Sequence, residues 1–238
     1  MRIITVAFIF LLSANGFSQT VVDVSKANQG AGLSNLYYVV GGVPMNNAKY
    51  VAIVEGSAFF SDSFATGKII LSGGKMYANT RLRLDLMDNT VHYISAEGEE
   101  LIATTPIKSI LLKDPVTQKE IQFDHSDFIM TLPRVETGWY QLLDTGAVRL
   151  YKRHNKTIRE NKPYNSATVE QYISTTYSYY ILINSVFTHV KKIRSLPDML
   201  QDKKAELLAF INSNNLTGKS DKDYLTLAAY YNSLVTKQ

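Results

Sequence analysis

The chain has 238 residues, a formal net charge of +4 at pH 7 and no cysteine. The absence of cysteine excludes a disulfide scaffold, a thiolate metal site and a cysteine nucleophile. The four histidines form no His-Glu-x-x-His pair, and the chain has no phosphate-binding loop, dinucleotide fingerprint or serine-hydrolase elbow. We therefore expect a non-catalytic protein with no cofactor, no metal site and no nucleic-acid partner.

Residues 1–18 have the pattern of a secretory signal peptide. Arg2 precedes an apolar run over residues 3–12, and small Gly16 and Ser18 stand where the signal peptidase reads the chain. The run is shorter than the roughly 20 apolar residues that span a bilayer. We expect cleavage between Ser18 and Gln19, which gives a secreted or periplasmic mature protein without a transmembrane segment.

The segment 19–137 is predicted to form a β-rich N-terminal domain. Leu82, Leu84 and Leu86 alternate with charged residues, which is typical of an antiparallel strand with one buried face. Turn residues separate the neighbouring apolar segments, so this half predicts an antiparallel β-meander or a small open barrel. Further strands are expected at residues 68–71, 90–95, 100–104, 107–112 and 120–123, and residues 37–40 and 50–54 are two more segments that could pair.

The segment 138–238 is predicted to combine β-hairpins with helices. Residues 139–153 and 179–192 each contain an aromatic pair, an aliphatic strand, an Asp or Asn turn and a basic end, which indicates two similar hairpins. Residues 161–168 are a candidate linker. Apolar stripes at helical spacing predict one helix over residues 203–212 and a second helix behind a cap at Ser220. The fold class is therefore α+β, in which the meander precedes β-hairpins and a C-terminal pair of amphipathic helices.

The densest basic stretch covers residues 149–162, in the half of the chain whose net charge is positive. Such a stretch suits an anionic partner, although an ordinary basic strand and loop explain it as well. Adjacent aromatic pairs leave one ring exposed on a strand, where it could stack on sugars or anchor a protein; core filling explains these rings equally. The possible binding surface comprises Arg149, Lys152, Arg153, Lys156, Arg159, Trp139 and Tyr179.

Residues 124–127, Asp-His-Ser-Asp, are the one dense polar cluster that contains a histidine. Neighbours in sequence seldom converge on one point, so a turn at the end of a strand is favoured over a metal or acid–base site. Paired carboxylates of the kind used in glycoside hydrolysis leave no linear motif. A carboxylate-based hydrolase therefore stays an alternative to a binding protein.

Several segments of the chain together resemble uncharacterised exported proteins of Bacteroidetes-type bacteria. They are the signal peptide ending in Ser-Gln, residues 56–67, the Tyr-Tyr-Ile-Leu-Ile-Asn hairpin that begins at Tyr179, and the Asp-Lys-Lys-Ala-Glu-Leu-Leu-Ala-Phe-Ile segment that begins at Asp202. The resemblance implies export and a β-then-helical layout, and it implies no activity. We expect a non-catalytic binding or structural component of the cell envelope, whose partner is an envelope protein or a glycan. The alternatives are a module that binds glycans or anionic surfaces, and the hydrolase.

Overall fold

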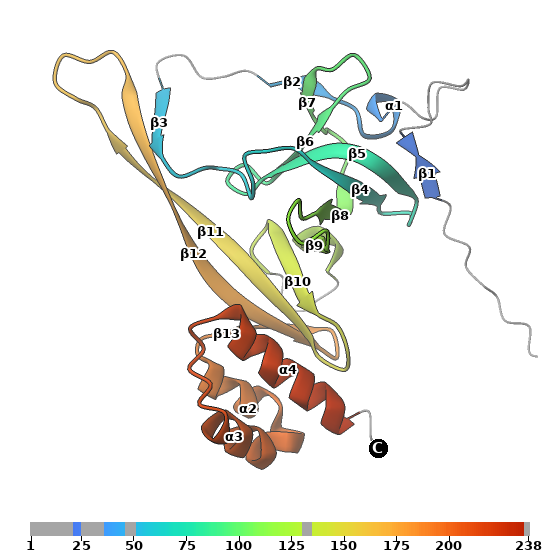
Figure 1. Ribbon diagram of the computed structural model, residues 1–238, viewed down its shortest axis with the longest axis vertical. Helices are drawn as coiled ribbons and strands as arrows, with labels where there is room; N and C mark the ends of the chain where they lie inside the picture. The colour runs from blue at the N-terminus through green and yellow to red at the C-terminus, as the bar shows by residue number, and fades with distance from the viewer. Residues whose placement is uncertain (1–20, 25–35, 46–50, 130–134, 236–238) are drawn as a thin grey trace, which may run out of the picture.

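The computed structural model describes residues 21–24, 36–45, 51–129 and 135–235. The predicted signal peptide lies outside the described residues. The chain forms an α+β fold in which one large, open and mostly antiparallel sheet carries helices at its C-terminal end (Figure 1). The predicted fold class is therefore confirmed. No helix of the described residues is long and apolar enough to cross a bilayer.

The N-terminal half supplies the strands of the meander and one short helix. Its strands are β1 (Val21–Asp23), β2 (Val43–Pro44), β3 (Val51–Glu55), β4 (Ala65–Leu71), β5 (Met76–Asp85), β6 (Thr90–Ile94), β7 (Glu100–Ile102), β8 (Ile107–Lys113) and β9 (Glu120–His125). The helix is α1 (Tyr37–Val40), so the prediction of a pairing strand at residues 37–40 is wrong. Val40 is fully buried there, and its carbonyl accepts hydrogen bonds from the amides of Thr104 and Thr105.

The C-terminal half supplies the remaining strands and the helical layer. Its strands are β10 (Trp139–Asp144), β11 (Arg149–Asn161), β12 (Val169–Ile183) and β13 (Val186–Val190), and its helices are α2 (Leu196–Met199), α3 (Lys204–Ser213) and α4 (Asp221–Val235). Three short 3₁₀ turns lie at residues 126–128, 193–195 and 201–203. The order of strands across the sheet is β13-β12-β11-β10-β9-β8-β4-β5-β6-β7-β2, while β1 pairs with β5 and β3 with β12.

The alternation of β5 shows why the meander forms. Leu82 and Leu84 are fully buried in the apolar core, and Arg81 and Arg83, which alternate with them, point to the opposite face. Tight turns with residues in the left-handed region, among them Asn89 at φ 56°, return the chain at the strand ends. Among the described strands, β13 and β2 stand at the two ends of this order and do not pair with each other, so the sheet is open.

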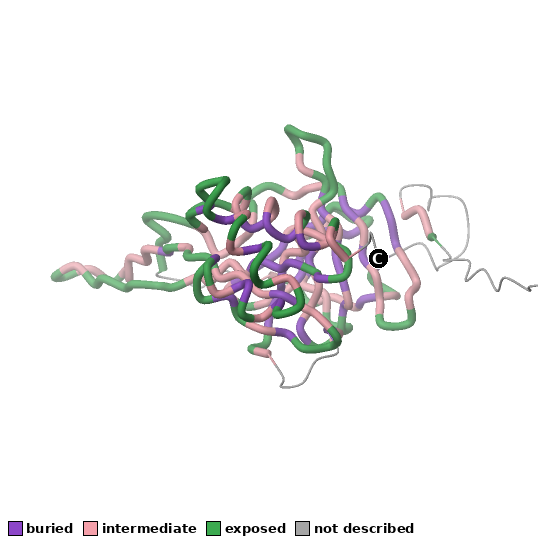
Figure 2. Tube along the Cα trace, turned by 90° about the horizontal axis from the view of Figure 1, so that it is seen from below, coloured by how far each residue is buried: buried purple, intermediate pink, exposed green. Residues whose placement is uncertain are grey.

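The long hairpin of β11 and β12 was not predicted from the sequence. Their register runs without interruption from Arg149↔Leu182 to Asn161↔Glu170. Residues 161–168, predicted as a linker, are the tip of this hairpin rather than a connection between domains. In Figure 1 the hairpin extends past the sheet to the upper left with β3 beside β12, and Figure 2 shows that its projecting end is exposed.

The C-terminal helices pack on one face of the hairpin strands. Leu150 and Ile181 of the sheet join Leu207 and Leu227 of the helices in one buried cluster. The predicted cap of α4 is present, because the Ser220 hydroxyl accepts a hydrogen bond from the amide of Asp223 at 3.3 Å. The two predicted hairpins and both predicted helices are therefore observed.

The boundary expected between residues 137 and 138 falls inside the continuous sheet. β9 and β10 pair across it from Trp139↔His125 to Leu142↔Gln122. The buried apolar residues nevertheless gather into one large cluster in each half, with a smaller third cluster around Tyr140 and Tyr151. The division into two domains stays a prediction, which limited proteolysis would test.

Candidate ligand-binding cleft

A polar cleft of about 600 Å³ lies on the sheet face opposite the helices. It runs over β8, β9 and β11 and is closed at one end by the two turns that flank the hairpin strands. Its polar lining consists of Lys108, Ser109, Gln122, Asp124, Arg149, Tyr151, Asn184 and Ser185, and its apolar lining includes Ile70, Phe128, Ile129 and Leu182. We call this site the Asp124 cleft.

Asp124 is the hydrogen-bonding centre of the cleft. Its carboxylate accepts from the hydroxyl of Ser109 at 2.6 Å, the amide of Gln122 at 2.8 Å and the phenol of Tyr151 at 3.0 Å. The register places Ser109 directly opposite Asp124, and alternation along β9 places Gln122 on the same face. Three donors hold the carboxylate in one orientation, which makes it a fixed anchor of the lining.

The basic side chains give the Asp124 cleft its net charge. Among the described residues, Lys108 and Arg149 are the two cations of the lining and Asp124 is its single carboxylate, so this lining is positive. Burial raises the pKa of Tyr151, the charge and hydrogen bond of Asp124 raise it further, and Arg149 lowers it by a smaller amount. The phenol therefore keeps its proton and serves as a donor to Asp124 at neutral pH.

The turn between β12 and β13 completes the end of the Asp124 cleft. Asn184 and Ser185 both have positive φ, at 47° and 62°, as a two-residue turn of the type that joins antiparallel strands requires. The turn brings an amide and a hydroxyl to the cleft beside the end of β11. Both groups can donate and accept hydrogen bonds.

Strand alternation divides the five predicted basic residues between the two faces of β11. Arg149, Arg153 and Arg159 share one face, while Lys152 and Lys156 share the other. Of the five, Arg149 alone lines the Asp124 cleft. The basic segment therefore does not form one continuous binding surface.

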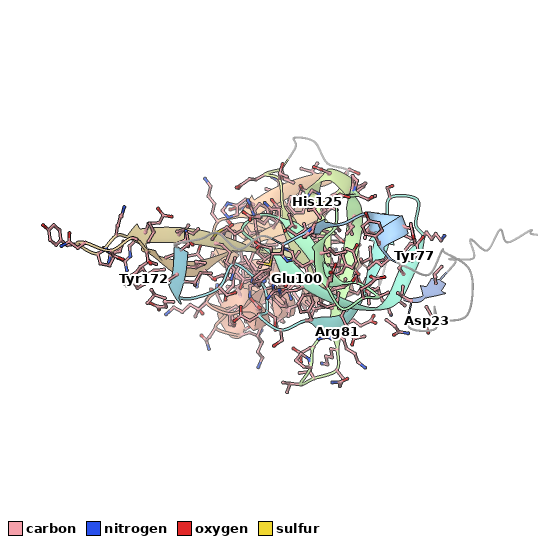
Figure 3. The ribbon with its side chains drawn as sticks, turned by 90° about the horizontal axis from the view of Figure 1, so that it is seen from above. Asp23, Tyr77, Arg81, Glu100, His125 and Tyr172 are labelled. Atoms are coloured by element: carbon pink, nitrogen blue, oxygen red, sulfur yellow. The ribbon has the colours of Figure 1, made fainter. Side chains whose placement is uncertain are left out.

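Three of these cations contact partners within the fold. Lys152 is 8% exposed and its ammonium lies 2.8 Å from a carboxylate oxygen of Asp221 at the start of α4. Arg153 forms an ion pair with Glu136. Arg159 lies over the ring of Tyr172 at 4.4 Å, on the projecting part of the hairpin (Figure 3).

The two predicted aromatic residues also serve the fold. Trp139 is 4% exposed, and its indole N–H donates to the carbonyl of Asn89 at 3.1 Å. Tyr179 stacks on Tyr224 with ring centroids 3.7 Å apart and donates its hydroxyl to Asp221. Both rings fix neighbouring elements, and neither lines the Asp124 cleft.

Residues 124–127 form the turn that the sequence favoured. β9 ends at His125, and residues 126–128 follow as a 3₁₀ turn in which His125 accepts from the amide of Asp127 at 3.4 Å. Alternation sends Asp124 into the Asp124 cleft and His125 to a separate cavity of about 250 Å³ beside Trp139. The cluster therefore does not converge on one site.

A second polar network is centred on Glu100 and was not predicted from the sequence. Its carboxylate lies 2.5 Å from the guanidinium of Arg83 and 2.6 Å from Nδ1 of His92. Burial alone would raise the pKa of Glu100, but hydrogen bonds from His92 and Arg83 lower it overall. Arg83 and His92 are opposite each other in the β5–β6 register, which local alternation could not reveal. His92 is 3% exposed, and the network links β5, β6 and β7 of the sheet, while Arg83 also lines a cavity of about 320 Å³.

The cavities supply little for acid–base or metal chemistry. Three cavities among the described residues are each lined by one acidic side chain, Asp124, Asp127 or Asp114. Across the described ranges, no group of three or more His, Asp or Glu residues could hold a metal ion. Retaining and inverting glycosidases both need two carboxyl groups about 5–10 Å apart across the substrate.

Comparisons with known proteins identify no relative from which a function could be inferred. No family model, curated protein or solved structure matches this chain. The geometry and charge of the cleft are therefore the features from which a function can be inferred.

Proposed function

We propose that the chain is a non-catalytic binding component of the bacterial cell envelope, exported by the signal peptide and binding an acidic glycan in the Asp124 cleft. The export proposal rests on the sequence of residues 1–18, with its short apolar run and small residues before Gln19. The binding proposal rests on the structure of the cleft.

The observation that supports the proposal most strongly is that the Asp124 carboxylate accepts three hydrogen bonds within a polar lining of positive charge. Its carboxylate already accepts three hydrogen bonds, so it orients the surrounding donors instead of acting as a free base. Gln122, Asn184 and Ser185 supply further donors and acceptors, while Lys108 and Arg149 supply positive charge. A ligand that is rich in hydroxyl groups and carries carboxylates matches both properties.

The hydrolase alternative is less well supported by the same cleft. No second carboxylate of the described part of the chain lines it, so these residues do not supply both a general acid and a general base or nucleophile. The serine of the lining is equally unsuited to nucleophilic attack, because the Ser109 hydroxyl donates to a carboxylate and has no histidine beside it.

Calorimetric titration with a tetramer of galacturonic acid, and with the neutral galactose tetramer, tests the binding proposal. We expect the acidic tetramer to bind, the neutral one to bind far more weakly, and the affinity to fall with added salt. Arg149→Ala should weaken binding about tenfold, because a hydrogen bond to a charged group contributes about 1.5–3 kcal/mol. Arg159→Ala removes an arginine from the same strand outside the cleft and should leave binding unchanged. Equal affinity for both tetramers, or no effect of Arg149→Ala, would contradict the proposal.

Fractionation and N-terminal sequencing test export separately. The full-length chain produced in a bacterial host should appear outside the cytoplasm with Gln19 as its first residue. Retention in the cytoplasm with residues 1–18 attached would refute export and leave the binding proposal standing.

A further inference from the structure

The projecting part of the β11–β12 hairpin, residues 153–178, which we call the arm, has an unpaired strand edge. β10 pairs with β11 only as far as Lys152, whereas β12 pairs with β11 up to Asn161. Within the described parts of the chain, no strand pairs with residues 153–161 on the side away from β12. Figure 1 shows this edge directed away from β3 and from the rest of the sheet.

An exposed edge of this length presents unsatisfied backbone donors and acceptors. Such an edge pairs readily with another strand, and natural proteins usually restrict that pairing with charged side chains. Here the charges are Lys156, Arg159 and Glu160, together with Arg153, which is already paired with Glu136. Their spacing determines which strand and which register the edge can accept.

The edge of a second copy of the chain can pair with this edge so that opposite charges face each other, in one symmetric register. Two-fold dimers are the commonest homo-oligomers, and a two-fold axis perpendicular to an antiparallel pair of strands passes midway between the two copies of one residue, which we call the residue on the axis. With Ile158 on the axis, Lys156 of each copy lies opposite Glu160 of the other, and Asn155 lies opposite Asn161. Opposite charges at directly facing positions stabilise an antiparallel pair.

Neighbouring symmetric registers lose these ion pairs. With Thr157 on the axis, Lys156 lies opposite Ile158. With Arg159 on the axis, Lys156 lies opposite Lys162, which places like charges together. The charge pattern therefore selects the register centred on Ile158.

The apolar residues favour the same register. Ile158 is 42% exposed although its partner across the β11–β12 ladder, Ile173, is only 6% exposed. In the register centred on Ile158, the two copies of this side chain lie against each other, which extends the Ile158–Ile173 pair of each copy into a row of four isoleucines. Gln171 meanwhile donates to Glu160 at 2.9 Å and holds that carboxylate on the same face as Ile158.

We infer that residues 155–161 of β11 form a homodimer interface, in which two copies of the chain pair their arms antiparallel about Ile158 and continue the sheet from one copy into the other. The interface uses backbone hydrogen bonds between the two edges, two Lys156–Glu160 ion pairs and the contact between the isoleucines. It lies apart from the Asp124 cleft, and so it is independent of the proposed ligand.

Charge-reversal variants test the register directly. Sedimentation of the full-length chain, as its host processes it, over a concentration series should show a dimer. K156E and E160K each place like charges together in both symmetric pairs and should raise the dimer dissociation constant about tenfold or more. The double variant K156E/E160K restores both pairs with reversed sign and should dimerise like the parent. An equimolar mixture of the two single variants should form a heterodimer of parental affinity.

The control is K119E, which reverses an exposed charge on the turn between β8 and β9 and should leave the dimer unchanged. Circular dichroism of each variant confirms that the sheet is intact. A chain that stays monomeric at every concentration would overturn the inference. Single variants that dimerise like the parent, or a double variant that fails to recover, would equally overturn it.

Discussion

The carboxylate of Asp221 joins the sheet to the helical layer, and its removal should destabilise the protein strongly. It accepts from the ammonium of Lys152 at 2.8 Å and from the hydroxyl of Tyr179, and it begins α4. Burial alone would raise the pKa of Asp221, but the hydrogen bonds from Lys152 and Tyr179 lower it overall. Asp221→Ala removes both hydrogen bonds and leaves a buried ammonium whose other contact is the ring of Tyr177, 3.9 Å away.

The expected loss follows from the burial of the two partners. A hydrogen bond to a charged group contributes about 1.5–3 kcal/mol, and breaking a fully buried ion pair costs about 3–5 kcal/mol. The side chain of Lys152 is 10% exposed and that of Asp221 is 39% exposed, so solvent reduces the cost to about 3 kcal/mol. For a chain of this size, that loss lowers Tm by about 6–12 °C.

Thermal and chemical unfolding measure the effect against a matched control. Asp198→Ala also removes an acidic residue from the first turn of a helix, but its partner Lys204 is 51% exposed and Asp198 itself 63% exposed. That variant should change the free energy of unfolding by no more than about 0.5 kcal/mol. Lys152→Met should cost less than Asp221→Ala, because the carboxylate it leaves behind reaches solvent and keeps Tyr179. Equal losses in Asp221→Ala and Asp198→Ala would refute the structural role of Lys152 and Tyr179.

Two further variants probe pH dependence and strand packing. Burial, with a smaller effect of Lys152, lowers the pKa of His154 to about 4 from 6.5 in the unfolded chain. The unfolded chain therefore binds the proton first, and the free energy of unfolding falls by about 3 kcal/mol as pH drops from 6.5 to 4. His154→Gln should flatten this slope in pH-dependent unfolding, and an unchanged slope would contradict the assignment. Gly67→Ala places a Cβ 2.4 Å from the carbonyl of Leu111 and should cost about 1–3 kcal/mol in urea unfolding, whereas Gly73→Ala, with no atom within 4 Å, should be neutral.

Local periodicity predicted the elements that bury one face. Leu82 and Leu84 alternate into the core, and Leu227 and Tyr231 form the buried stripe of α4. In both elements the spacing of apolar residues along the sequence indicates which face is buried. The arm shows no such alternation, because most of its residues are polar or exposed and Ile173 is its one buried apolar residue, so the full length of β11 and β12 was not predicted.

The Asp124 cleft depends on pairing between distant segments. Ser109, Asp124 and Tyr151 lie on β8, β9 and β11, and only the strand register brings their side chains together. The sequence identified Arg149 as a candidate, but it could not separate this residue from Lys152 on the other face of the strand. Residues 37–40 show the opposite error, because their aromatic and β-branched side chains favour a strand while buried contacts at Val40 hold a helical turn.

Chemical-shift mapping of the chain titrated with the galacturonic acid tetramer tests the central claim most directly. The account predicts saturable shifts of the amides of Lys108, Gln122, Arg149 and Ser185, which surround the Asp124 cleft, and none on the arm. Shifts confined to residues 153–161, or no saturable shifts at all, would contradict the assignment of the Asp124 cleft as the binding site.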